Sequence, residues 1–243
     1  MSGLRFALRL AALILALLAA LPLHAAWRLL RSPSPWPRLF LAAVSRIVGA
    51  RPRRVGMPLK HDVVFVANHL SWIDIPLLAA ATGTAFVGKA ELRALPLVGW
   101  LCTLNHTIFV SREDRLQVTR QIARLRETLA EGWSVAIFPE GTTGDGVTLL
   151  PFKSALMAML APPPPGMRVQ PVRIDYGDAT RELAWVGDEP GQHHAARVLR
   201  RRGRFDATLT FLDPFDPAPI GDRKAIALEA RARIERGRAG RPG

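Results

Sequence analysis

Polar side chains that could do acid–base chemistry follow a short apolar run in this 243-residue sequence. The run Val63–Val66 is β-branched and aromatic, which is typical of a buried strand. Asn68, His69 and Ser71 come where such a strand should end, and Asp74 comes five residues after the histidine. Since α/β proteins place their reactive groups at the carboxyl ends of strands, we expect a functional site here.

His69 and Asp74 are the residues with the clearest chemical meaning. If Ser71 caps a helix, Asp74 lies in the first turns of that helix and reaches back to the imidazole. A carboxylate bonded to one ring nitrogen fixes the tautomer and leaves the other nitrogen free to take a proton from a hydroxyl. The alternative is a structural histidine beside a helix-capping aspartate. The neighbouring Asn68 and Ser71, behind an apolar strand, favour a catalytic dyad.

Further strands are expected to end at polar residues that contact a substrate. The expected strand Ala85–Gly88 is followed by Lys89, and Thr107–Val110 is followed by Ser111 and Arg112. A guanidinium at a strand end binds phosphate and carboxylate alike, although an ordinary solvated arginine is the alternative for Arg112.

A fourth expected strand, Ser134–Phe138, leads into a glycine-rich loop that contains Glu140, Gly141 and Thr142. Glycines let the backbone of such a loop approach a ligand closely. A structural turn also uses glycine and proline. Because a carboxylate directly after a buried strand is less expected of a mere turn, we predict that this loop contacts substrate.

The remaining pattern completes an α/β domain. A helix is expected to begin at Pro151 and to run through Met159, and Val169–Ile174 should be a strand. Pro171 lacks an amide donor, which predicts an edge strand or a bulge. An alternating strand is expected at Phe205–Leu212, followed by a charged helix from Asp222 to Arg238.

The N-terminal segment is apolar, and the chain as a whole is basic. No charged residue occurs from Leu10 to Trp27, and a second apolar helix is expected from Leu39 to Val48. We therefore divide the chain into membrane-associated N-terminal helices, residues 1–50, and an α/β domain with a basic tail, residues 51–243. A cleaved signal peptide is the alternative, but near Ala25 and Ala26 the third position before the cleavage site would be Leu or His instead of a small residue.

The formal net charge of +13 favours an anionic partner. The sequence contains no zinc-finger spacing, no aromatic RNA-binding strand and no basic region followed by heptads, so anionic lipid is preferred to nucleic acid as the partner. The single cysteine, Cys102, excludes an intrachain disulfide. No metal site is expected, because no cluster of cysteine and histidine has metal-ligand spacing.

The sequence blocks resemble the bacterial 1-acylglycerol-3-phosphate acyltransferases, the lysophospholipid acyltransferase family. That family carries NHxSxxD, GxIFIxR, FPEGTR and a proline–valine pair in a strand. These blocks match, in order, Asn68–Asp74, Ile108–Arg112, Phe138–Thr142 and Pro171–Val172, and Lys89 matches a lysine ahead of the second block. The departures are His106 in place of the first glycine of the second block and Thr143 in place of the final arginine of the third.

The departure at Thr143 bears on the acceptor. In family members that acylate lysophosphatidic acid, the arginine at this position is implied to hold the acceptor phosphate. Loss of a charge-assisted hydrogen bond weakens binding by about 1.5–3 kcal/mol, although Arg112 and Lys89 can compensate. The run FPEGTTGDG followed by LPFKS is similar to lyso-ornithine lipid O-acyltransferases, so both acceptors stay open.

The resemblance implies a mixed α/β sheet flanked by helices, with an N-terminal membrane-associated helical pair. It implies an acyltransferase in which His69 is the general base and Asp74 its partner. The expected partners are a lysolipid acceptor, an anionic membrane and a thioester donor, either CoA or acyl carrier protein, with no cofactor. The expected location is the cytoplasmic face of the inner membrane. A non-catalytic lipid-binding protein of the same fold is the alternative.

Overall fold

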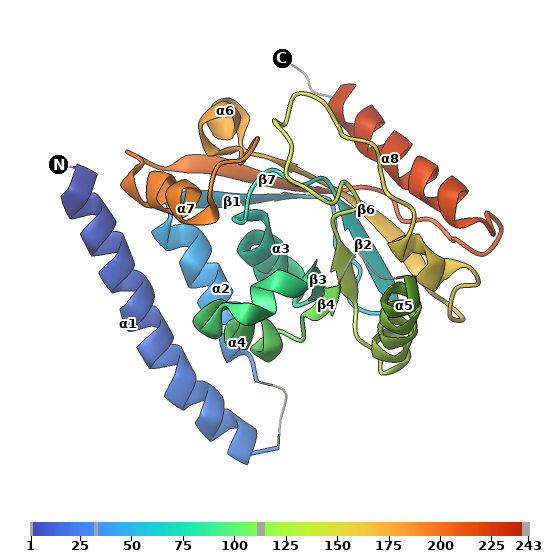
Figure 1. The fold of residues 1–243 in the computed structure, drawn as a ribbon, viewed down its shortest axis with the longest axis horizontal. Helices are drawn as coiled ribbons and strands as arrows, with labels where there is room; N and C mark the ends of the chain where they lie inside the picture. Colours follow the sequence, from blue (N-terminus) through green and yellow to red (C-terminus); the bar gives the residue numbers. More distant parts are fainter. Residues whose placement is uncertain (1, 32–33, 111–114, 240–243) are drawn as a thin grey trace.

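A mixed β-sheet forms the centre of the computed structural model, which describes residues 2–31, 34–110 and 115–239 (Figure 1). Within these residues the sheet has seven strands in the order β1-β7-β6-β2-β5-β3-β4. Neighbouring strands are parallel except β6 and β7. The strands are β1 (Ala50–Val55), β2 (Val63–Ala67), β3 (Ala85–Lys89), β4 (Ile108–Val110), β5 (Val135–Ile137), β6 (Arg168–Asp175) and β7 (Phe205–Phe211). The expected mixed α/β fold is confirmed.

Helices flank the sheet on both sides (Figure 1). The α-helices are α1 (Ser2–Leu29), α2 (Trp36–Ile47), α3 (Asp74–Thr82), α4 (Pro96–Leu104), α5 (Arg115–Ala130), α6 (Thr180–Leu183), α7 (Gly191–Arg200) and α8 (Arg223–Ala239). Short 3-10 turns are η1 (Ala90–Ala94), η2 (Leu156–Leu160) and η3 (Gly177–Ala179).

The core lies on both faces of the sheet because successive residues of a strand point to opposite sides. All five residues of β2 are buried. Phe65 packs into one apolar cluster with Leu77 of α3 and Val198 of α7. Val66 packs into another with Leu125 of α5 and, from α8, Ile226. The unbroken apolar run of β2 therefore reflects a strand that is covered on both faces.

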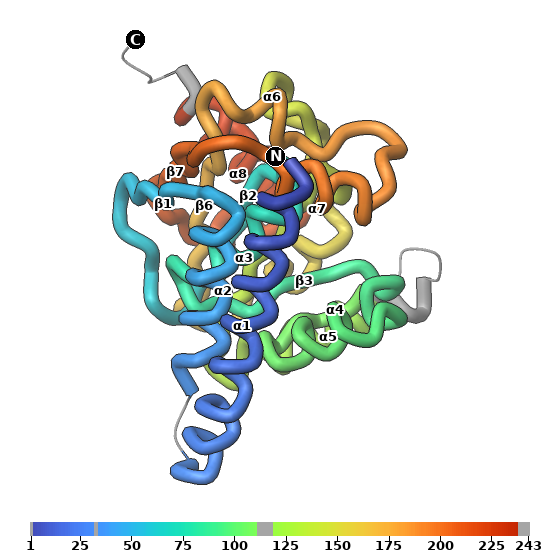
Figure 2. The backbone as a smooth tube through the Cα atoms, turned by 90° about the vertical axis from the view of Figure 1, so that its left-hand side faces the viewer, coloured from blue at the N-terminus to red at the C-terminus, as the bar shows by residue number. Residues whose placement is uncertain are grey.

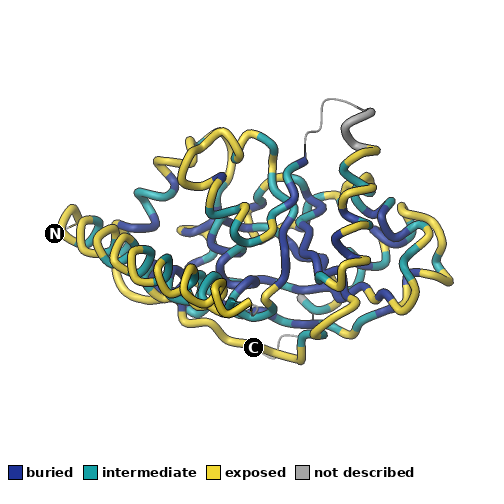
Figure 3. Tube along the Cα trace, turned by 90° about the horizontal axis from the view of Figure 1, so that it is seen from below, coloured by how far each residue is buried: buried dark blue, intermediate teal, exposed yellow. Residues whose placement is uncertain are grey.

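The N-terminal helices α1 and α2 lie side by side, and α1 extends along the outside of the molecule (Figures 1 and 2). α1 is long and apolar enough to cross a membrane, by its length and composition alone. Its outward face is exposed along the whole helix (Figure 3), including Leu8, Leu15 and Leu18. The division of the chain at residue 50 stays a prediction.

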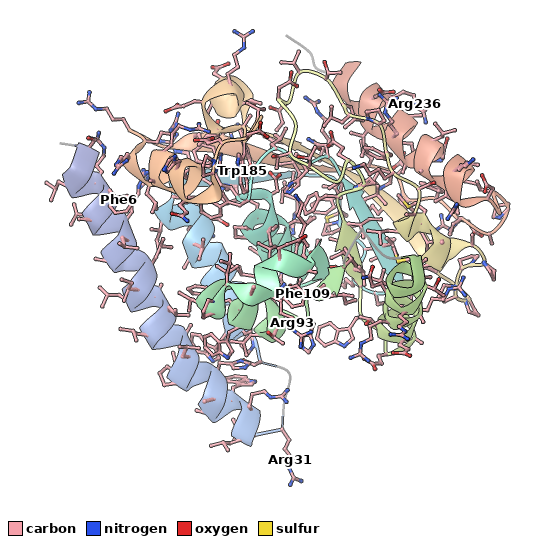
Figure 4. All side chains as sticks on the ribbon, in the orientation of Figure 1. Phe6, Arg31, Arg93, Phe109, Trp185 and Arg236 are labelled. Atoms are coloured by element: carbon pink, nitrogen blue, oxygen red, sulfur yellow. The ribbon has the colours of Figure 1, made fainter. Side chains whose placement is uncertain are left out.

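Polar contacts fasten the N-terminal half of α1 to α7. The Arg9 guanidinium donates to the carbonyl oxygens of Val198, at 3.0 Å, and Gly203, at 3.3 Å. A cation at the C-terminus of a helix satisfies free carbonyls and opposes the negative end of the helix dipole. The Arg200 guanidinium also lies over the ring of Phe6 on α1, 5.2 Å from its centroid (Figure 4).

One sequence-based prediction about secondary structure is wrong. The segment from Pro151 to Met159 forms only the 3-10 turn η2, because the amide of Lys153 donates to the carbonyl of Pro139 at 2.8 Å and keeps the chain extended. The edge strand β1, which contains Arg51–Arg54 and pairs with β7, was not predicted from the sequence.

Pro171 does not lie in an edge strand, since β6 has neighbours on both sides. The pairing with the segment after β7 is irregular beside Pro171, and the extra residue lies in that segment and not in β6. Val172 pairs with Phe211, whereas Val169 pairs with Phe215, so two residues of β6 face three of the partner segment. The extra residue opens the ladder at a position where proline has no amide to donate.

Gly56, directly after β1, provides a test of this packing. Its φ is +76°, and a Cβ would lie 2.3 Å from the carbonyl oxygen of Phe211. Gly132 has a similar φ of +84° but no atom within 4 Å of a Cβ. We expect Gly132→Ala to lower the free energy of unfolding by about 1–3 kcal/mol through backbone strain, and Gly56→Ala to lower it further. Thermal unfolding in mild detergent measures both, and equal losses would contradict the close approach of β1 to β7.

Candidate active site

The predicted site residues that the structure describes lie at one edge of the sheet. His69 follows β2, Lys89 ends β3, and Glu140 follows β5. These three strands are parallel, so their carboxyl ends meet at the same edge. Lys89 is exposed there. Arg112 lies outside the described residues, two positions beyond the end of β4.

His69 and Asp74 form the predicted pair. The Nδ1 atom of His69 lies 2.8 Å from Oδ2 of Asp74, which is fully buried. The imidazole is 18% exposed and stacks on the ring of Phe138, with centroids 4.1 Å apart. Because the carboxylate accepts at Nδ1, the proton resides there and Nε2 is the basic nitrogen. Within the described part of the chain, Nε2 has no hydrogen-bond partner.

Asp74 also shapes the loop that carries His69. Its Oδ2 accepts hydrogen bonds from the amides of Leu70, at 2.6 Å, and Ser71, at 2.9 Å. The expectation that Ser71 caps the helix is wrong, because α3 begins at Asp74 and its N-cap residue is Ile73, which makes no side-chain cap. An aspartate in this first turn is also favoured by the helix dipole.

Glu140 supports the same loop from β5. Its Oε1 accepts the amide of His69 at 2.7 Å, and its Oε2 accepts the amide of Leu150 at 2.9 Å. The side chain is buried, and burial raises the pKa of its carboxyl although both amides oppose the shift. Glu140 thus holds the His69 backbone in place, while its predicted contact with substrate stays a prediction.

The glycine-rich loop binds the backbone of His69. Gly141 has a φ of +74°, which favours glycine, and the amide of Gly144 donates to the carbonyl of His69 at 2.8 Å. Thr142 lies between them on the loop. The Thr143 hydroxyl donates to the carbonyl of Trp185, so this side chain fixes the segment between α6 and α7 instead of reaching outward.

Trp185 completes the support from that segment (Figure 4). Its amide donates to the carbonyl of Leu70 at 2.8 Å, and its indole donates to the carbonyl of Glu189 at 2.7 Å. The sequence of the segment between α6 and α7 does not predict this role. Its contribution is made by backbone groups, which leave no signature in residue types.

Two more residues support the pair in ways that the motifs did not indicate. The Asn68 amide pairs with both backbone groups of Ile174, donating at 3.0 Å and accepting at 2.7 Å, which ties the end of β2 to β6. The Tyr176 hydroxyl donates to Oδ1 of Asp74. The only sequence signal for Tyr176 is that it directly follows an expected strand, and it is 102 residues from Asp74.

The backbone amides near His69 do not serve as donors for an oxyanion, because each is already bound. The amide of His69 donates to Glu140, and those of Leu70 and Ser71 donate to Asp74. These three donors are therefore occupied. In this arrangement the loop orients a base, and the donors for a developing negative charge must come from other groups.

Glu140→Gln tests the support of the loop. A glutamine side chain has one acceptor oxygen in place of two, so one of the amides of His69 and Leu150 loses its partner. We expect the free energy of unfolding to fall by about 1–3 kcal/mol. Chemical denaturation measures the loss, with the exposed Glu131→Gln as the matched control. A stability equal to that of the control would show that the two hydrogen bonds contribute nothing.

Comparison with known proteins agrees with this geometry. A family model described as "Acyltransferase" matches residues 47–175, which contain the pair and the glycine-rich loop. A lyso-ornithine lipid O-acyltransferase of Rhodobacter capsulatus is 35% identical over 96% of this chain and 90% of its own. A 1-acyl-sn-glycerol-3-phosphate acyltransferase of Neisseria gonorrhoeae is 35% identical over 49% of this chain and 46% of its own.

A solved structure shares the fold. The 1-acyl-sn-glycerophosphate acyltransferase PlsC of Thermotoga maritima aligns over the full length of both chains, with a TM-score of 0.65 and 20% identity. The family model covers more than half of the chain, and the first relative covers nearly all of it. Among the described residues, Nε2 of His69 has no hydrogen-bond partner, and the buried Asp74 contacts Nδ1, an arrangement suited to a general base. The chain therefore belongs to the acyltransferase family.

Proposed function

We propose that this protein is a lysolipid O-acyltransferase that moves a fatty acyl group from a thioester to a hydroxyl of the lipid acceptor. The observation that carries this proposal is the contact of Asp74 with Nδ1 of His69, which leaves Nε2 without a hydrogen-bond partner in the described part of the chain. The donor is acyl-CoA or an acylated carrier protein, and no cofactor takes part. The names of the relatives support a lysolipid as the acceptor.

The proposed reaction proceeds without a covalent enzyme intermediate. Nε2 of His69 removes the proton from the acceptor hydroxyl as its oxygen attacks the thioester carbonyl. Asp74 stabilises the imidazolium that forms, and the stacked ring of Phe138 holds the imidazole plane. The tetrahedral intermediate then expels the thiolate, which takes up the proton from His69. The products are the acylated lipid and a free thiol.

Binding of the reactants is assigned to groups at the same sheet edge. Lys89 and Arg112 would bind the anionic group of the acceptor, since Lys89 ends β3 and Arg112 follows β4 in the sequence, and both strands belong to the sheet that carries His69. The loop of Glu140, Gly141 and Thr142 would position the acceptor. Because positioning converts a bimolecular reaction into an effectively unimolecular one, these residues would supply much of the rate enhancement.

Two observations favour lyso-ornithine lipid over lysophosphatidic acid as the acceptor. The relative that carries the first name aligns with nearly the whole chain, whereas the relative named for the glycerol phosphate acceptor aligns with about half. In addition, Thr143 supplies no charge for a phosphate, and its hydroxyl donates to Trp185. The acceptor headgroup is therefore proposed to carry an amino acid.

We assign the protein to the cytoplasmic face of the inner membrane. The outward face of α1 exposes Leu8, Leu15 and Leu18 over its length, although its N-terminal half is fastened to α7. On α4, Leu97 and Trp100 are also exposed. A helix with one docked face and one apolar face suits an interfacial position, and the charge of +13 suits an anionic surface.

Replacement of His69 tests the enzymatic proposal. We expect His69→Ala to lower the rate of acyl transfer by about 10²–10⁴-fold, because the general base is lost. The exposed His193→Ala should retain wild-type activity. The measurement is transfer from a labelled acyl thioester to a panel of lysolipids. Wild-type protein without turnover on any acceptor would instead indicate a lipid-binding protein of the same fold.

The same panel tests the acceptor. We expect kcat/KM for lyso-ornithine lipid to exceed that for lysophosphatidic acid by about 10- to 150-fold, the equivalent of one missing charge-assisted hydrogen bond. Thr143→Arg should raise the relative rate with lysophosphatidic acid. Thr143→Ser keeps a hydroxyl for the Trp185 carbonyl and should keep the wild-type preference. A wild-type preference for lysophosphatidic acid would reject the assignment.

A further inference from the structure

Tyr176 is a buried polar residue that the reaction described above does not use. It follows β6, and its side chain is almost wholly buried. Its hydroxyl donates to Oδ1 of Asp74, and its ring packs edge-on against Phe205 of β7, with centroids 5.5 Å apart. The strands β6 and β7 therefore hold the hydroxyl in a fixed place.

The two oxygens of Asp74 have different partners. Oδ2 accepts hydrogen bonds from Nδ1 of His69 and from the amides of Leu70 and Ser71. Among the described residues, the hydrogen-bond partner of Oδ1 is the Tyr176 hydroxyl. Without this hydroxyl, one oxygen of a fully buried carboxylate would lack a hydrogen-bond donor. The loss of a donor destabilises a buried charged group more than a buried neutral one.

The hydroxyl also stays a donor over the working pH range. Burial, with the Asp74 carboxylate beside it, raises the pKa of the Tyr176 phenol well above its ordinary value. The titratable groups that face Asp74 are His69, Glu140 on the segment after β5, His194 on α7 and Tyr176 itself. Of these, the phenol and the imidazole of His69 share hydrogen bonds with the carboxylate.

We propose that Tyr176 is a positioning residue for the pair of His69 and Asp74, which holds the Asp74 carboxylate turned so that its Oδ2 faces His69. The torsion that orients a carboxylate is broad, so an aspartate needs partners on both oxygens to hold one orientation. The hydroxyl also withdraws negative charge from the carboxylate and thereby limits how strongly the pair binds a proton. This inference rests on the proposed function for its kinetic consequences but not for its geometry.

The first test is Tyr176→Phe, which removes the hydroxyl and keeps the ring. We expect kcat to fall by about 10- to 100-fold with KM little changed, as for the loss of one hydrogen bond to a charged group. The acid limb of the pH–rate profile should move to higher pH, because a carboxylate with one donor fewer makes the pair bind a proton more tightly. Thr128→Val on α5 is the matched control, since it also removes one buried hydroxyl at constant shape.

The second test uses the fact that Tyr176 is the sole tyrosine of the chain. Growth on 3-fluorotyrosine therefore alters this one phenol and leaves the hydroxyl in place, so the variant retains its hydrogen bond. Fluorine makes the phenol a stronger donor, and the acid limb should move to lower pH, opposite to Tyr176→Phe. Opposite shifts support the positioning role. An acid limb that stays at the wild-type pH in both proteins overturns it.

A measurement without turnover separates this inference from the proposed function. Nuclear magnetic resonance of ring-labelled histidine in the full chain follows the titration of His69, which is assigned by comparison with His69→Ala. The His69 signal should titrate at higher pH in Tyr176→Phe and at lower pH with fluorotyrosine. Shifts in these directions support the role of Tyr176 even if no acceptor is turned over. An unchanged titration in both proteins overturns it even if the enzyme is active.

Discussion

The structure around His69 and Asp74 depends on the burial of one negative charge. Removing the Asp74 carboxylate from water is costly unless hydrogen-bond donors surround it. Two backbone amides, an imidazole and a phenol do so, and they come from its own loop and from the end of β6. The loop from His69 to Ser71 must therefore wrap around the carboxylate. The same loop conformation orients the imidazole of His69. The hydrogen bonds that stabilise the Asp74 carboxylate therefore also fix the position of the imidazole.

A second set of contacts holds the outer side of this loop. The amide of His69 is bound to Glu140 and its carbonyl to Gly144, while the carbonyl of Leu70 is bound to Trp185. These three backbone groups thus have partners outside the loop, whereas the amides of Leu70 and Ser71 are bound within it by Asp74. Such complete pairing is what a rigid catalytic loop requires, because an unpaired buried backbone group would favour rearrangement.

Sequence alone predicted the parts of this site that are local. The strand Val63–Ala67 and the five-residue spacing from His69 to Asp74 place the base and its partner without further information. The role of Tyr176 could not be predicted, because it depends on how β6 lies beside β2, and residue types do not encode that pairing. The 3-10 turn at Leu156–Leu160 was expected as a full helix for a similar reason. Hydrogen bonds from distant segments overrode its local helical pattern.

The attachment of α1 has a consequence for where along a lipid the reaction occurs. Arg9 binds the end of α7, and α7 continues the segment whose Trp185 holds Leu70 beside the base. An anchor joined by a flexible linker would let the base sample many heights above a bilayer. If α1 lies in the membrane as proposed, an anchor fixed in this way would hold His69 at one height. The depth of a hydroxyl below the headgroup, and not its chemistry alone, would then decide which position of the acceptor is acylated.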